Sequence, residues 1–136
     1  MDECIFDKII NGEISAAKVT EDDNFLAFLS IAPNNPGHTL VIPKKHVSYI
    51  FEMDQEDLEK ILVFAKPRAK AIKKVFNPKT GKVGIVVVGL DIPHVHIHLI
   101  PMNEAGDLDH GRANHNVPFE EIQKNAEKIK EALQEI

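Results

Sequence analysis

The sequence is poor in several residue types that define classes of protein. Its 136 residues include one cysteine, Cys4, one tyrosine and no tryptophan. A lone cysteine excludes an intrachain disulfide, and with it the small secreted proteins that disulfides hold together. Apolar runs such as residues 85–88 are far shorter than the roughly 20 residues that cross a bilayer. The first residues lack the basic and apolar segments of a signal peptide, so we expect a cytoplasmic protein.

Positive charge is also scarce. Sixteen lysines and arginines against 21 acidic residues give a net charge of −5 with histidine neutral. Non-specific binding of nucleic acid needs a basic surface, so we expect neither nucleic acid nor a membrane as a partner. A nucleotide bound in a local pocket remains compatible with this charge. The length and the 43% hydrophobic content predict a single domain over residues 1–136.

Histidine, by contrast, is concentrated in one stretch. His94, His96 and His98 alternate with apolar residues, and a period of two is typical of a strand whose two faces differ. We expect the three rings on one face, about 7 Å apart, and the apolar residues facing a core. Three interpretations are open: a half-exposed strand that carries histidines, a zinc site, and catalysis through a covalent histidine intermediate.

Residues 94–100 fit the His-x-His-x-His-x-x pattern, with apolar x, of the histidine triad (HIT) superfamily. Residues 5–6 and the block 36–46 also resemble its Hint-like branch, and the resemblance covers residues 3–101. It implies an α+β HIT fold, with an antiparallel sheet of about five strands, a long central helix and a C-terminal helix. It further implies a homodimer in which the two sheets join across a two-fold axis. Residues 102–136 would then form a C-terminal loop and helix after the core.

The resemblance also implies a chemistry for the histidines. By match to the motif, His96 would attack the α-phosphorus of a nucleotide and form a nucleotidyl-histidine intermediate that water hydrolyses. His98 would hydrogen-bond the phosphate oxygens and the leaving group, and His94 and His38 would orient and polarise the site. Imidazoles and backbone amides would neutralise the charge without a metal. The implied function is hydrolysis of a nucleoside 5′-phosphoramidate or similar nucleotide conjugate.

Apolar residues match the family positions that form a slot for a purine base, and plain core packing is the alternative for each. These residues are Ile5, Phe6, Ile9, Phe28 and Ile31.

The sequence departs from the family pattern at the sugar and the phosphate. Ser30 stands where relatives have an aspartate for the ribose, and a serine lacks the charge-assisted contact of a carboxylate. Residues 89–93 replace a longer glycine-rich phosphate loop, and Leu90 and Asp91 stand at its polar positions. Gly89 still permits close approach of the backbone. Asp91 is either a general acid for the leaving group or a turn residue that caps local amides.

These departures leave two other functions open. One is a nucleotide-binding, regulatory HIT protein with weak turnover. The other is a dinucleotide polyphosphate hydrolase or nucleotidyl transferase of the same superfamily.

The N-terminus raises the question of a metal. Many Hint-like relatives have two cysteines here that bind structural zinc with two histidines, whereas this chain has Asp7 in place of the second cysteine. A site made of Cys4, Asp7, His46 and His94 is conceivable, because carboxylates also bind zinc. We favour a small buried thiol beside a surface acid, and therefore no cofactor.

Local patterns predict the remaining elements. Asp54 is the expected N-cap of a long helix, and Pro67 should kink or break that helix near residues 63–66. Arg112 is a candidate phosphate contact in the loop after the triad. The expected helices are 3–10, 54–76 and one opened by Pro118, and the expected strands are 19–20, 25–29, a central 38–42 and a buried 83–88.

Overall fold

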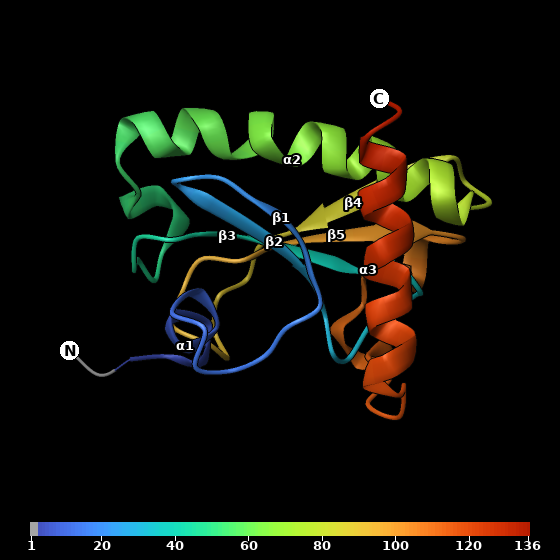
Figure 1. Cartoon of the computed structure of the whole chain (residues 1–136), viewed down its shortest axis with the longest axis horizontal. Coiled ribbons are helices and arrows are strands. Elements are labelled where there is room, and N and C mark those ends of the chain that lie inside the picture. The colour runs from blue at the N-terminus through green and yellow to red at the C-terminus, as the bar shows by residue number, and fades with distance from the viewer. Residues whose placement is uncertain (1–2) are drawn as a thin grey trace.

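The computed structural model describes residues 3–136 and contains a five-stranded antiparallel sheet in the order β1-β2-β3-β5-β4 (Figure 1). The strands are β1 (Lys18–Glu21), β2 (Phe25–Leu29), β3 (Thr39–Pro43), β4 (Lys82–Val86) and β5 (Ile97–Met102). The helices are α1 (Ile5–Ile10), α2 (Gln55–Phe76) and α3 (Phe119–Leu133). This architecture confirms the predicted α+β fold within one chain.

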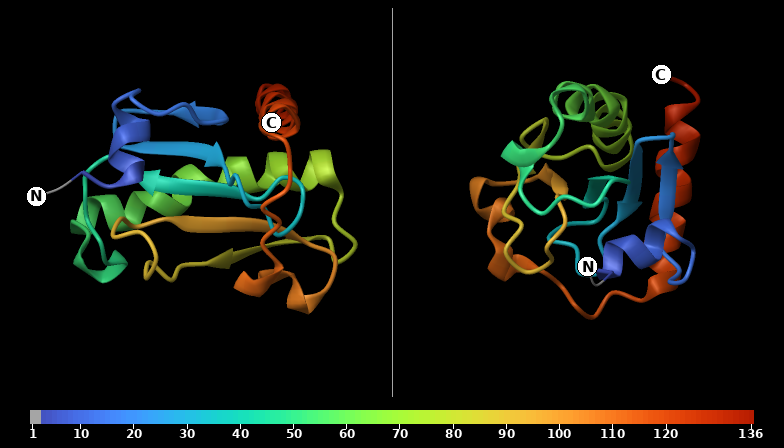
Figure 2. Two further views of the ribbon diagram at one scale, coloured as in Figure 1. Left: turned by 90° about the horizontal axis from the view of Figure 1, so that it is seen from below. Right: turned by 90° about the vertical axis from the view of Figure 1, so that its left-hand side faces the viewer.

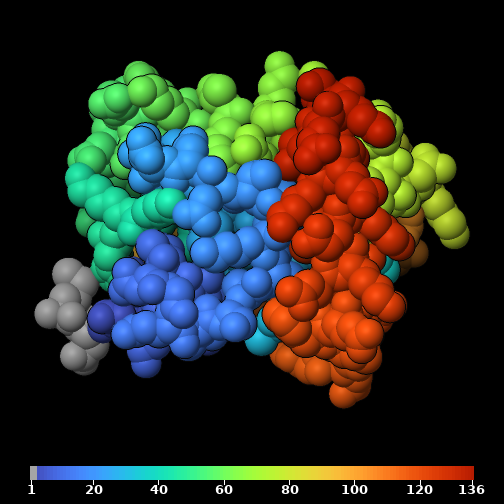
Figure 3. All heavy atoms as spheres, in the orientation of Figure 1, coloured from blue at the N-terminus to red at the C-terminus, as the bar shows by residue number. Residues whose placement is uncertain are grey.

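The two faces of the sheet are covered by different helices. Side chains of α2 and α3 form one apolar cluster with the sheet, and α1 forms a second cluster with β2 and β3 on the other face (Figure 2). All five residues of β2 are buried, because successive side chains point to opposite faces and both faces are covered. Figure 3 shows α3 packed beside the β1–β2 segment. The site described below lies on the α1 face.

The helix α2 is continuous across Pro67, so of the two predicted outcomes, a kink or a break, the break is wrong. The proline removes the hydrogen bond to the carbonyl of Val63, and the Val63 side chain is 69% exposed, so this side of the helix faces solvent. Water at that side can satisfy the carbonyl. Asp54 does occupy the N-cap position, but its carboxylate pairs with Lys45 instead of capping the helix. Across residues 3–136, no helix is both long and apolar enough to cross a membrane.

The strand β4 is at the edge of the sheet, and the prediction of a buried strand over 83–88 is wrong. The strand ends at Val86, and Ile85 is 52% exposed. β-branched residues favour strands, but this preference does not distinguish an edge strand from a central one. The central position predicted for the strand that becomes β3 is confirmed.

After β5 the chain folds back through two short 3-10 turns, η2 (Ala105–Leu108) and η3 (His110–Arg112). Asp107 accepts hydrogen bonds from the backbone N–H groups of Asn103 and Glu104, and Arg112 donates to the same carboxylate. Arg112 also pairs with Glu104 and does not line the cavity described below. Its predicted role as a phosphate contact is therefore wrong, and it instead holds this segment together.

Candidate active site

A cavity of about 580 Å³ opens beside α1, at the sheet face that carries His38, His96 and His98. Its volume is in the range of small-molecule sites, and its lining is mostly apolar. The structure brings around it every residue that the sequence suggested for substrate binding, namely Ile5, Phe6, Ile9, Phe28, Ser30, Ile31, Gly89 and Asp91. Gly89 has a φ of +72°, a backbone conformation that favours glycine.

The tautomer of His96 follows from its contacts. Its Nδ1 lies 2.7 Å from the carbonyl oxygen of His94, which only accepts hydrogen bonds, so Nδ1 carries the proton. In the neutral ring Nε2 then keeps its lone pair, and it is the nitrogen left free for the cavity. The ring is 6% exposed and packs edge-on against Phe6, with 5.1 Å between the ring centroids. The neutral form of His96 is therefore held in the tautomer that leaves the lone pair of Nε2 available.

His38 and His98 form a directed chain of hydrogen bonds. The backbone N–H of Asn34 donates to Nδ1 of His38 at 3.0 Å, so the neutral ring carries its proton on Nε2. That nitrogen lies 2.9 Å from Nδ1 of His98 and donates to it. The remaining nitrogen of His98, Nε2, then carries a proton that it can donate into the cavity. One histidine of the site offers a lone pair and its neighbour offers a donor.

Two histidines of the site, His38 and His98, are uncharged near neutral pH. Burial, together with the neighbouring His98 and His110, lowers the pKa of His38 to about 3. Burial also lowers the pKa of His98 to about 4, together with the proximity of His96 and His110. Among the described residues, no lysine or arginine lines the cavity. A bound phosphate is therefore met by hydrogen-bond donors and not by fixed positive charges.

A comparison with known proteins now decides the family. The HIT domain matches residues 11–105 of the 136. The chain belongs to the HIT domain family.

Two relatives align with this chain over nearly its whole length and over nearly the whole of their own. An uncharacterized HIT-like protein of Methanocaldococcus jannaschii is 41% identical over 128 residues, which cover 89% of this chain and 96% of that protein. An adenosine 5′-monophosphoramidase of Schizosaccharomyces pombe is 37% identical over 130 residues, covering 93% and 95%.

Solved structures agree with this assignment. A HIT-like protein of Bartonella henselae matches with a TM-score of 0.82 at 34% identity, over 97% of this chain and 98% of that one. A zinc-bound histidine triad protein of Mycobacterium smegmatis has the same fold, with a TM-score of 0.82 at 24% identity over 98% and 94% of the two chains.

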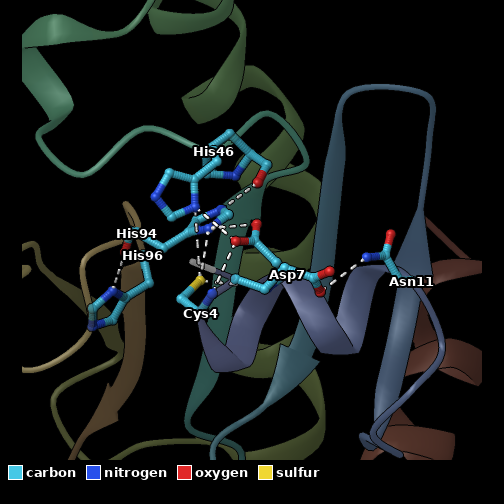
Figure 4. Close-up of polar contacts among 8 residues, drawn as sticks. Cys4, Asp7, Asn11, His46, His94 and His96 are labelled. Atoms are coloured by element: carbon cyan, nitrogen blue, oxygen red, sulfur yellow. Dashed lines mark hydrogen bonds and ion pairs between the residues drawn. The ribbon is translucent and has the colours of Figure 1, made fainter. Parts of the chain in front are cut away.

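The first histidine of the HIT motif does not face the cavity. His94 is fully buried, its Nε2–H donates to the carbonyl of Pro43 at 2.7 Å, and its Nδ1 lies 3.3 Å from the sulfur of Cys4 (Figure 4). The three rings do share the α1 face, because Phe6 of α1 contacts the rings of both His94 and His96 while Val95, Ile97 and Leu99 belong to the apolar cluster on the opposite face. The expectation of one face is confirmed, but His94 points towards Cys4, and of the three rings only those of His96 and His98 line the cavity. His94 acts on His96 through its carbonyl oxygen.

Cys4, Asp7, His46 and His94 form a compact polar cluster at the start of α1 (Figure 4). Asp7 accepts from the backbone N–H of Cys4 at 3.1 Å and lies 2.8 Å from Nδ1 of His46. Burial raises the pKa of Asp7, but hydrogen bonds from Cys4 and His46 outweigh this effect and lower it overall. Burial, with the nearby Asp7 carboxylate, raises the pKa of the Cys4 thiol. The separate thiol and surface acid expected from the sequence are not present.

The cluster fits a tetrahedral metal ion. Zinc bonds of 2.0 to 2.3 Å place neighbouring ligand atoms about 3.3 to 3.8 Å apart. Here Nδ1 of His94 lies 3.3 Å from the sulfur of Cys4 and 3.4 Å from a carboxylate oxygen of Asp7, and Nδ1 of His46 lies 3.9 Å from the same sulfur. The fourth pair, Nδ1 of His46 and the Asp7 carboxylate, is closer at 2.8 Å, a hydrogen-bond distance that a bound ion would lengthen. Since His94 donates through Nε2, its Nδ1 is an acceptor, as are the Asp7 carboxylate and the Cys4 sulfur once the thiol has lost its proton. A cation would bind all three acceptors.

The sequence did not predict every residue of the cavity, and His110 is the titratable one that it missed. His110, in η3, lines the cavity, and its Nε2 lies 3.4 Å from the carboxylate of Asp91. Its irregular spacing from the other histidines gave no signal, because the contact arises only when the segment after β5 folds back. Ser30 lines the cavity as well, and its hydroxyl accepts from the backbone N–H of Ala32 at 3.1 Å.

Proposed function

We propose that this HIT protein hydrolyses a nucleoside 5′-phosphoramidate or a similar nucleotide conjugate through a nucleotidyl intermediate on His96. The observation that carries the proposal is the hydrogen bond from Nδ1 of His96 to the carbonyl of His94, which leaves Nε2 unprotonated beside the cavity. A neutral ring fixed in this tautomer is the form that a histidine nucleophile needs. The 37% identical monophosphoramidase of S. pombe supports the same reaction class.

In the first step Nε2 of His96 forms a bond to the α-phosphorus, and the bond from phosphorus to the leaving nitrogen breaks. The leaving amine takes up one proton from solvent, and the substituted imidazole becomes positively charged. In the second step water attacks phosphorus, the electron pair of the P–N bond returns to Nε2, and one proton goes back to solvent. Nε2–H of His98 donates to a phosphate oxygen in both steps, where charge develops.

The nucleoside would lie between α1 and the sheet. Ile5, Phe6 and Phe28 line that part of the cavity and offer apolar surface to a purine. Gly89 permits close approach of its backbone N–H to the phosphate. The hydroxyl of Ser30 is the candidate contact for the ribose.

The deciding experiment is release of AMP from adenosine 5′-phosphoramidate by the purified protein, with AMP binding measured in parallel. Turnover that saturates with substrate supports the hydrolase. Saturable AMP binding without turnover would favour the regulatory, nucleotide-binding alternative, to which Ser30 and the short 89–93 connection would then point. Faster cleavage of a dinucleotide polyphosphate than of the phosphoramidate would favour a dinucleotide polyphosphate hydrolase or nucleotidyl transferase.

We further propose that the cluster of Cys4, Asp7, His46 and His94 binds one structural zinc ion, which would tie α1 to the start of the triad segment and take no part in the reaction. Adding Zn²⁺ to chelator-treated protein is expected to raise Tm by about 5 °C or more, since a ligand that binds only the folded state stabilises it. His46→Asn should lose this shift and the bound metal. His115→Asn changes an exposed histidine outside the cluster and should keep both. Equal zinc content in the two variants, measured by mass spectrometry, would contradict the proposal.

We also propose a two-fold homodimer joined at the exposed edge of β4. An unpaired strand edge beside exposed apolar side chains is a surface that proteins normally cover. Ile85→Lys is expected to convert the dimer to a monomer in sedimentation experiments, because it places a charge in the interface. Ile136→Lys is a matched control, since Ile136 is 56% exposed, against 52% for Ile85, and lies at the far end of the chain. A wild-type monomer, or a dimer unaffected by Ile85→Lys, would contradict the prediction.

A further inference from the structure

The register of the strands places His98 in the middle of the cavity floor. Phe28 pairs with Leu40, Leu40 pairs with His98, and His98 pairs with Val86, so these side chains form one row across the sheet. The β2 side of His98 leads to α1 and to the slot for the nucleoside. The β4 side of the same cavity has no role in that slot. We define the distal lobe as the part of the cavity lined by Val86, Ile100 and Leu108.

Gly84 shapes the floor of the distal lobe. It pairs with Ile100 on the cavity face, and a Cβ atom at Gly84 would lie 2.7 Å from a methyl group of Leu108 and from the sulfur of Met102. The absence of a side chain therefore allows η2 to pack against β4, which brings Leu108 into the cavity. The distal lobe is thus a formed apolar surface and not a gap at the sheet edge.

The charges of the cavity disfavour an anionic leaving group. Among the cavity-lining residues of the described chain there is no lysine or arginine, and the one acidic residue is Asp91, which pairs with His110 at 3.4 Å. A carboxylate repels phosphate groups, and no cation balances it apart from this one histidine. A leaving group with further phosphates would therefore bury uncompensated charge here, whereas an apolar group would be removed from water.

We propose that the distal lobe binds the leaving group of the substrate and selects an uncharged apolar amine, alkyl or arylalkyl, bonded to the α-phosphorus. Directly paired residues on neighbouring strands are about 5 Å apart, and Val86 pairs with His98. When His98 binds the phosphate, the first atoms of the leaving group therefore lie within contact distance of Val86. The inference rests on the proposed hydrolase function and names the substrate class of that site. The reaction itself is unchanged: the P–N bond breaks and the amine leaves with one proton from solvent.

The test compares two substrates that share the same primary amine chemistry, the AMP phosphoramidates of hexylamine and of the side-chain nitrogen of lysine. Each buried methylene is worth about 0.8 kcal/mol, or about fourfold, so kcat/KM should be at least about tenfold higher for the hexylamine conjugate. Leu108→Ser should reduce this ratio by about tenfold. Leu62→Ser, at a half-exposed leucine of α2 outside the cavity, should leave the ratio unchanged.

Gly84→Ala provides a second variant, because its Cβ displaces Leu108 from the lobe without adding a polar group; it should also reduce the ratio. A ratio near one in the wild type, or a ratio that neither variant changes, would overturn the inference while leaving the hydrolase intact. Absence of turnover for both conjugates and for the unsubstituted phosphoramidate would instead overturn the proposed function, and the inference with it.

Discussion

Replacing His96 by asparagine is expected to lower the release of AMP from adenosine 5′-phosphoramidate by at least about 10⁴-fold, the scale on which removal of a catalytic nucleophile acts. The variant keeps a side-chain N–H that can donate to the carbonyl of His94, so the local hydrogen bond survives. It has no lone pair on nitrogen with which to attack phosphorus. The fold should therefore persist while the covalent route is lost.

Two controls separate loss of the nucleophile from a general effect of the substitution. His115→Asn removes an exposed histidine that does not line the cavity and should show wild-type turnover. Binding of AMP to His96→Asn, followed by calorimetry, should remain within about tenfold of wild type, because the nucleoside slot is intact. Near-normal turnover in His96→Asn would remove this residue from the mechanism.

The free energy of unfolding is expected to fall as the pH is lowered from about 6.5 towards 4.5. The pKa of His38 is lowered to about 3 and that of His98 to about 4 in the folded protein, from an ordinary value of 6.5. Between these values the unfolded chain binds protons that the folded protein does not, so stability is complete above pH 6.5 and is lost as the pH falls. Each histidine lowers the free energy of unfolding by about 1.4 kcal/mol for every pH unit below 6.5. The loss for the pair is therefore about 5 kcal/mol at pH 4.5, relative to pH 6.5.

Urea titrations at a fixed protein concentration, repeated at half-unit pH steps, measure this slope. His38→Gln removes one of the two groups and should reduce the slope by about half, since its amide oxygen can still accept from Asn34. His115→Asn, at an exposed position, should reproduce the wild-type slope. A stability that is flat between pH 6.5 and 4.5 would show that the two rings are already accessible to protons.

The sequence pattern of the triad segment correctly predicted which of its side chains face the core, because that depends only on neighbouring residues. The alternation around the triad placed Val95, Ile97 and Leu99 in the core, where each is 1% exposed. The same alternation placed His94 on the α1 face with the other two rings, but it could not predict that this ring contacts Cys4 and lies outside the cavity. A period of two identifies the face of a residue, not what lies opposite it on that face.

Features that depend on distant parts of the chain could not be predicted. The valines of β4 indicated a strand but not its edge position, which depends on the order of the whole sheet. His110 and Arg112 are two residues apart in the sequence, yet one lines the cavity and the other pairs with Glu104 and Asp107. Only the folding of the segment after β5 onto the sheet separates their roles.

His94 contacts both the nucleophile His96 and the start of α1, and this double contact affects how the protein could lose activity. Its carbonyl sets the tautomer of His96, while its ring contacts Cys4 in front of α1. That helix has only six residues, too few to be stable alone, and it carries one wall of the nucleoside slot. If α1 detaches, the slot opens and the support of the nucleophile loosens in the same event, while α2, α3 and the sheet remain folded. Local opening of this kind needs less free energy than global unfolding, so inactivation should precede denaturation, and amide hydrogen exchange in α1 should be faster than in the sheet.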